Sequence, residues 1–327
     1  MAGRNKWRSQ KTDRAERRQR AICTLWRMTL GANVLQWEKT GERGTHMSEV
    51  AAMQAAGDLV VDHRNRRVKL HLYDSGRIGE MDAVMRRLAR EAEATKLIVY
   101  GKKKDVPQWL SLGYRQEGTI DGFFRGENAQ MLSCFLTEER AVSAAPQVAE
   151  DILQLSLAKA GRGEAKPLPP GYSLREATPA DADELARLYR LVFATYPTPM
   201  DDPDYVRRTM SESTYYVVAE HDGRIACAAS AEVTERFGSA ELTDCATHPD
   251  HVGKGLLQPL FAALEEKMEE MGIYYLYTLT RAQSPGMNVT AAKHGYRYRG
   301  RLINNCTIFS GYEDMNIWVK PLRPTRE

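Results

Sequence analysis

Hydrophobic and polar residues alternate in two separate stretches of the chain, and each stretch predicts a mixture of strands and helices. Within residues 58–136, RVKLHLYD, TKLIVYG and AQMLSCFL have the composition of strands, whereas IGEMDAVMRRLAREAEA has apolar residues at helical spacing. Beyond residue 172 we expect a helix, a hairpin turning at Asp222-Gly223, a strand ending near His248, a second long helix and further strands. The pattern predicts an α/β (α+β) fold with a mixed sheet.

Composition and internal similarity divide this pattern into parts. The Gly/Pro-rich segment 161–171 is the strongest boundary signal. Gly113-Tyr114 and Gly295-Tyr296 lie at matching places in two similar stretches, at an offset of 182 residues, so the first stretch is interpreted as a degenerate half-copy of the second, without catalysis. We therefore expect a basic, flexible extension at 1–57, a smaller domain at 58–160, a linker at 161–171 and a catalytic domain at 172–322.

Charge and cysteine content narrow the class of protein. The 327 residues carry a net charge of +3, but residues 1–46 hold eleven Lys/Arg against four Asp/Glu, so +7 lies there and −4 in the rest. This arm is interpreted as a solvated extension. Two alternatives stay open: the arm tethers the protein to nucleic acid or a membrane, or translation starts at Met47. The sequence has no apolar run of about 18 residues, no signal-peptide pattern and five scattered cysteines, which predicts a cytoplasmic protein with reduced thiols.

The turn Gly253-Lys254-Gly255 is the best candidate for ligand binding. Its glycines permit a tight turn, and an amphipathic helix with Leu260 and Phe261 on its apolar side follows directly. Free N–H groups at the positive end of such a helix suit a pyrophosphate. By itself an ordinary strand-to-helix connection has the same pattern. A metal site is not expected, because His248-x-x-His251 has no third ligand nearby.

The order of elements around this turn resembles the GCN5-related N-acetyltransferase (GNAT) family. CATHPDHVGKGLL matches that family at the strand end, at His248-Pro249 and at both glycines, and departs from it at Val252 and Leu257. The resemblance implies an acyl-CoA-binding GNAT fold preceded by a smaller, degenerate GNAT-like domain, with acetyl-CoA as co-substrate and no metal. The implied contacts to acetyl-CoA are Cys245, Ala246, Thr247, Val252, Gly253, Lys254, Gly255, Leu256, Leu257 and Asn288.

A narrower resemblance covers residues 58–322. DPDYVRRTM, AELTDCAT, GMNVTAAKHGYRYRGRLINNCTI and EDMNIWVKPL are similar to the β-lysine N6-acetyltransferases. This resemblance implies acetylation of the side-chain amine of β-lysine to N6-acetyl-β-lysine, a compatible solute, after lysine 2,3-aminomutase. Another small diamine or amino acid, or a catalytically silent acetyl-CoA-binding module, stays open. A small amine is the expected partner, nucleic acid is not, and a homodimer is undecided.

Three residues are assigned to the chemistry. Glu241 lies four residues before Cys245, where the wider family carries a glutamate base; a strand-face ion pair is the alternative. By resemblance, the N–H of Ala246 donates to the oxyanion. The family's usual tyrosine acid is replaced by Ala291, so Tyr296 or Tyr298 is the candidate substitute, and a tyrosine packed in the core is the alternative interpretation.

The substrate residues follow from the need to bind ammonium and carboxylate groups. In a regular strand Asp244 would point away from the face of Glu241, and a bulge would change that. The candidate substrate contacts are Tyr196, Asp244, Asn304, Asn305 and Glu313, with Glu232 and Arg301 as further candidates.

Overall fold

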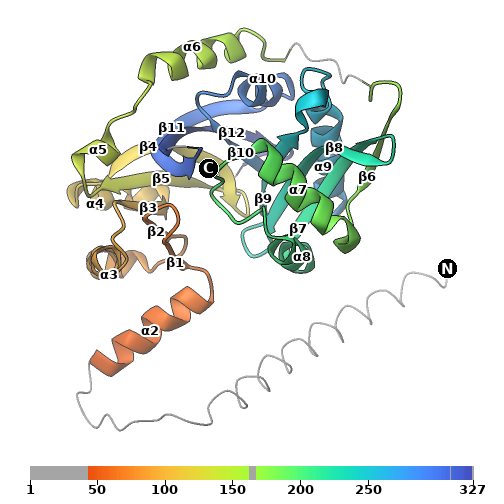
Figure 1. Cartoon of the computed structure of the whole chain (residues 1–327). Helices are drawn as coiled ribbons and strands as arrows, with labels where there is room; N and C mark the ends of the chain where they lie inside the picture. The colour runs from red at the N-terminus through yellow and green to blue at the C-terminus, as the bar shows by residue number, and fades with distance from the viewer. Residues whose placement is uncertain (1–42, 162–166, 310, 326–327) are drawn as a thin grey trace, which may run out of the picture. The chain divides into compact units, whose positions relative to one another are not determined.

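The computed structural model describes residues 43–161, 167–309 and 311–325. The expectations for residues 1–42 of the basic extension and for residues 162–166 of the linker lie outside these residues, whereas residues 43–55 of the extension form a helix. The first part of the chain contains these elements (Figure 1): α2 (Arg43–Ala55), β1 (Leu59–Asp62), β2 (Arg67–Leu70), α3 (Ile78–Glu91), β3 (Lys96–Gly101), α4 (Val106–Ser111), β4 (Arg115–Phe124), β5 (Glu127–Phe135), α5 (Glu138–Ala141) and α6 (Pro146–Leu157).

The second part continues with a hairpin, a strand-turn-helix unit and a final antiparallel pair. The Asp222-Gly223 turn is confirmed, with φ of 52° and 71°, as a hairpin turn of the primed type requires. The elements are β6 (Tyr172–Glu176), α7 (Ala182–Val192), α8 (Pro203–Glu212), β7 (Thr214–His221), β8 (Arg224–Thr234), β9 (Ser239–Thr247), α9 (Leu257–Glu270), β10 (Tyr275–Arg281), α10 (Pro285–Lys293), β11 (Arg297–Ile308) and β12 (Gly311–Pro321).

Among the described residues, twelve strands form a single mixed sheet in the order β1-β2-β3-β5-β4-β11-β12-β10-β9-β8-β7-β6. The first half has β2 parallel to β3, then antiparallel β5 and β4. The second half has β9 parallel to β10, then antiparallel β12 and β11. The two halves thus have the same strand arrangement, and β2 is the counterpart of β9.

The two halves meet at a pair of glycines. Gly118 of β4 pairs with Gly300 of β11, and a Cβ on Gly118 would lie 2.6 Å from the carbonyl oxygen of Arg299. The neighbouring carboxylate of Glu117 accepts from the Lys96 ammonium (2.7 Å) and from the backbone N–H of Ile303 (2.7 Å). A close backbone approach and a buried charged pair therefore join the half-sheets.

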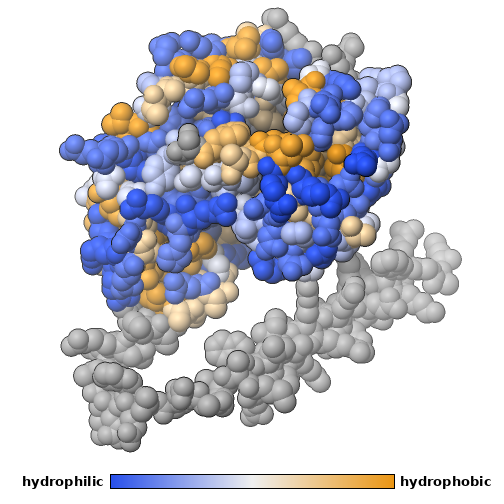
Figure 2. All heavy atoms as spheres, in the orientation of Figure 1, coloured by the Kyte–Doolittle hydropathy of each residue, from blue (hydrophilic) through white to orange (hydrophobic). Residues whose placement is uncertain are grey.

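Helices cover the second half-sheet on both faces. Leu260, Phe261 and Leu264 of α9 are fully buried against one face, which confirms the predicted apolar side of this helix. Leu185 and Tyr189 of α7 are buried against the other face. Figure 2 shows a largely hydrophilic surface, with apolar side chains gathered over α6. None of the helices in the described ranges is long and apolar enough to cross a membrane.

Candidate active site

Strand β9 carries one extra residue at its centre. The ladder to β8 pairs Thr243 with Ser230 and then Ala246 with Ala228, so two β9 residues lie where β8 has one. The extra position is occupied by Asp244, whose φ of 50° is left-handed. This is a β-bulge. It is held by the Ser230 hydroxyl, which donates to the Asp244 carboxylate at 2.7 Å.

The bulge places Glu241 and Asp244 on the same side of the sheet. Before it, Leu242 packs into the α9 core; after it, Cys245 contacts the α9 core and Ala246 packs on the α7 side. A regular strand would have separated the two acids. Asp244 therefore does not point away from the face of Glu241, as it would in a regular strand; the bulge brings the two together. Both carboxylates line one cavity.

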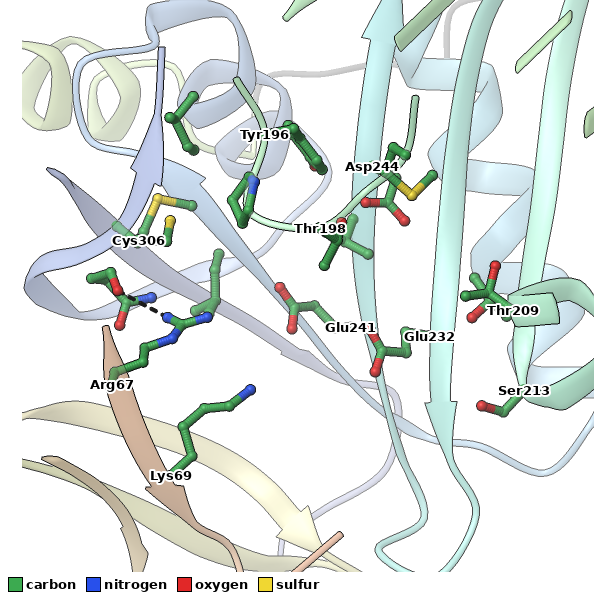
Figure 3. Close-up of a pocket in the computed structure, with 18 of the residues that line it drawn as sticks. Arg67, Lys69, Tyr196, Thr198, Thr209, Ser213, Glu232, Glu241, Asp244 and Cys306 are labelled. Carbon is green, nitrogen blue, oxygen red and sulfur yellow. Dashed lines mark hydrogen bonds between the residues drawn. The ribbon is translucent and has the colours of Figure 1, made fainter. Parts of the chain in front are cut away.

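This cavity of about 360 Å³ lies between the two half-sheets. Its size is typical of a site for a small molecule. In Figure 3, Arg67 and Lys69 of β2 point into it from one side. Glu232 of β8 and Glu241 of β9 lie across from them. The first half, for which the sequence indicates no catalysis, thus contributes part of the cavity wall.

The environment of Glu241 keeps its side chain partly protonated near neutral pH. Burial raises its pKa to about 8, and the charge of Glu232, its cross-strand partner, adds to this effect, while the ammonium of Lys69 opposes it. Burial also raises the pKa of Asp244 to about 6, against the hydrogen bond from Ser230. A carboxylate with a pKa near the working pH suits a general base.

The β9–β10 ladder ends inside the site. Its last pair is Glu241 with Tyr277, and β9 continues to Thr247 without a ladder partner in β10. Backbone groups on this side of β9 are therefore available to an extended ligand. Ala246 and Thr247, two of the predicted acetyl-CoA contacts, both lie in this segment.

The glycine turn that follows is shaped for an anion. Gly253 and Gly255 have φ of 82° and 77°, a backbone conformation that L side chains rarely adopt. Within the described chain, the N–H groups of residues 253–256 have no backbone acceptor, and Val252 to Gly255 are exposed. These amides precede the N-terminus of α9, a 14-residue helix. The turn and the unpaired edge of β9 fit the pyrophosphate and the extended arm of acetyl-CoA.

Two residues predicted to bind the cofactor or take part in the chemistry, Asn288 and Tyr296, are buried inside the fold. The amide oxygen of Asn288 accepts from Thr280, Asn316 and Trp318 at 2.8–2.9 Å, and its NH₂ group donates to two backbone carbonyls. This side chain is fully used inside the fold. Tyr296 is 2% exposed, packs in the α9 core and has no hydrogen-bond partner for its hydroxyl among the described residues. The structure does not bring it to the cavity.

Some of the predicted substrate residues line the cavity and others do not. Tyr196 and Asn305 line the cavity together with Asp244. Asn304 does not, because its amide donates to the backbone carbonyls of Glu139, Arg140 and Val142.

The remaining two charged candidates are engaged in contacts within the fold. Glu313 forms a two-pronged salt bridge with Arg281, with both N···O distances 2.7 Å. Arg301 is also turned away, donating to Asn316 and to the carbonyl of Ala149 in α6. Neither belongs to the cavity lining.

Sequence reasoning missed the cations of the site. Arg67 and Lys69 stand two residues apart in RVKL, an alternation that an ordinary half-exposed strand also has. One signal in the sequence could have pointed to them: the internal repeat, in which β2 occupies the position that β9, the strand with Glu241, occupies in the second half. Within the described ranges, no His, Cys, Asp and Glu side chains are grouped to hold a metal ion.

Comparison with known proteins identifies relatives along most of the chain. Residues 182–296 match the acetyltransferase (GNAT) family. The N-acetyltransferase YodP of Bacillus subtilis is 38% identical over 80% of this chain and 96% of its own length. The β-lysine N6-acetyltransferase of Methanosarcina mazei is 36% identical over 76% of this chain and 98% of its own length. That of Methanococcus maripaludis is 31% identical, over 80% and 96% respectively.

Proposed function

Because the chain belongs to the β-lysine N6-acetyltransferase family of GNAT enzymes, and is thus an N-acetyltransferase that uses acetyl-CoA, we propose that it acetylates the side-chain amine of β-lysine. The observation that carries this proposal is the cavity beside the open end of the β9–β10 ladder. Its wall presents carboxylates opposite cations, which matches a small diamino acid with a carboxylate and two ammonium groups.

We assign the base to Glu241. The ε-ammonium of a lysine-type substrate has a pKa of about 10.4 and must lose a proton before it can attack. The ionised Glu241 carboxylate takes that proton inside the cavity, and the neutral amine then attacks the thioester carbonyl of acetyl-CoA. The pKa of about 8 makes Glu241 a stronger base than an exposed glutamate.

The rest of the reaction falls to the backbone of β9. In our assignment the N–H of Ala246, beyond the bulge, donates to the oxygen that becomes negative when the C–N bond forms. Collapse of this intermediate breaks the C–S bond; the nitrogen gives up its second proton, which neutralises the leaving thiolate, and the products are the amide and free CoA. Tyr296 as the proton donor to that thiolate stays a prediction from the sequence.

Thiol release from acetyl-CoA tests the proposal directly. The purified protein is given β-lysine, α-lysine, ornithine or spermidine in separate reactions, and CoA is measured as free thiol. We expect a strong preference for β-lysine. Preference for another of these amines would show that the enzyme has a different substrate in the same class. Acetyl-CoA binding without release from any amine would favour a silent binding module.

A further inference from the structure

We propose that Lys69 and Arg67 bind the carboxylate of the amino-acid substrate, so that the first half of the molecule determines which amines are accepted. This inference rests on the function proposed above and adds a specificity site to it. Both residues belong to β2, and both line the cavity that also holds Glu241. The first half has no counterpart of the Gly253-Lys254-Gly255 turn, so it would then act in substrate recognition instead of cofactor binding.

Lys69 is a cation without a direct salt-bridge partner in the described chain. Its side chain is partly buried in the cavity wall, yet no hydrogen bond or salt bridge to it is formed within the described chain. Burial lowers the pKa of its ammonium, the charge of Arg67 adds to this, and the charges of Asp62, Glu232 and Glu241 only partly offset it. An ammonium held away from water is unfavourable unless an anion accompanies it. A substrate carboxylate is such an anion.

Arg67 is held in place beside Lys69 by the surrounding fold. Its Nε donates to Asp62 at 2.8 Å, and one terminal nitrogen donates to the carbonyl of Asn305 at 3.0 Å. No described residue accepts a hydrogen bond from its other terminal nitrogen. A fixed guanidinium with a free N–H group, next to an unpaired ammonium, is suited to a carboxylate.

Asn305 supplies an acceptor next to this pair. Its side chain is 3% exposed, lines the cavity and has an amide oxygen with no partner among the described residues. A buried, unpaired amide oxygen favours a donor. The ammonium on the third carbon of β-lysine lies two carbons from the carboxylate carbon, so it would reach Asn305 when the carboxylate is on Lys69.

The layout of charge fixes which end of the substrate reacts. Cations gather on β2, whereas Glu232 and Glu241 face them as a pair on β8 and β9. A substrate with its carboxylate on Lys69 therefore directs its far amine towards the base. The two halves use equivalent strands for opposite tasks, since β2 corresponds in the topology to β9.

The test compares β-lysine with 1,4-diaminopentane, which is β-lysine without its carboxylate. Lys69→Met should lower kcat/KM for β-lysine by roughly 10- to 100-fold, mainly through KM, because one charge-assisted contact is lost. The same variant should change kcat/KM for 1,4-diaminopentane less than about threefold. Lys69→Arg should retain most of the activity with β-lysine. Lys103→Met, which removes an exposed lysine of the same half, should affect neither substrate.

The outcomes separate this inference from the proposed function. Equal losses on both substrates would overturn it, because Lys69 would then act on Glu241 or on the fold. A second measurement needs no variant: the wild-type protein should prefer β-lysine to its carboxamide by roughly 10-fold or more. Equal use of the acid and the amide would also overturn the inference. If the wild type acetylates none of these amines, the proposed function is wrong instead.

Discussion

Replacing Glu241 by glutamine should make the protein more stable and nearly inactive. Turnover should fall by roughly 10²- to 10⁴-fold, as expected when a general base is removed. The gain in stability has a separate cause. The folded protein holds Glu241 at a pKa of about 8, against 4.5 for the unperturbed side chain. The folded state therefore binds the proton more tightly than the unfolded chain does.

The sign and size of the effect follow from this difference. Below pH 4.5 the group is protonated in both states; above it, the unfolded chain releases its proton first, so stability falls as the pH rises towards 8. The maximal slope is about 1.4 kcal/mol per pH unit. Because Glu241 is only half-buried and solvent screens part of its charge, we expect a total of about 1–2 kcal/mol. Such a difference corresponds to a shift in Tm of roughly 3–6 °C.

Thermal denaturation of both proteins from pH 5 to pH 8 measures this effect. The Tm of Glu241→Gln should equal that of the wild type near pH 5 and exceed it by the stated amount at pH 8. Acetyl-CoA affinity, measured by calorimetry, serves as the control and should not change. A Tm difference that does not depend on pH would refute the burial argument. Unchanged turnover would remove Glu241 as the base.

Three further substitutions test other parts of the structure. Gly253→Val should weaken acetyl-CoA binding by roughly tenfold or more, because φ of 82° strains any L side chain; unchanged affinity in calorimetry would mean that the phosphates bind elsewhere. Asn288→Ala should lower the unfolding free energy by about 3 kcal/mol with acetyl-CoA affinity retained; lost affinity without lost stability would instead support the predicted contact of Asn288 with acetyl-CoA. Gly118→Val should lower stability in urea by about 2 kcal/mol, and an unaltered midpoint would contradict the close approach to Gly300.

The fold was largely predictable because its signals are local. The alternation in RVKLHLYD, the Asp222-Gly223 turn and the apolar side of α9 each determine one element without help from distant residues. The repeat at an offset of 182 residues also corresponds to a real equivalence of strand arrangement. The single sheet that crosses from one half to the other was not predictable. It depends on contact between Gly118 and Gly300, which are far apart in the sequence.

Only the part of the site formed by one continuous stretch of sequence was predictable. Glu241 and the glycine turn lie on a short continuous stretch, so their spacing indicated their proximity. The side on which Asp244 points depends on one left-handed residue, and local composition does not determine it. Asn288 and Asn304 are typical binding residues by type, yet their amides are used by the fold. Lys69 acquires its significance only from the half-sheet opposite.

The Gly118–Gly300 joint also bears on how such a protein can evolve. A duplicated domain that had only lost its cofactor turn would be dispensable, and deletion could remove it without harm. Here, removing the first half would leave β11, a strand of 12 residues, as an unprotected edge prone to pairing with other chains. It would also take away one wall of the cavity. The first half therefore has two structural roles, covering the edge of β11 and completing the cavity wall, and its own sequence motifs indicate neither of them.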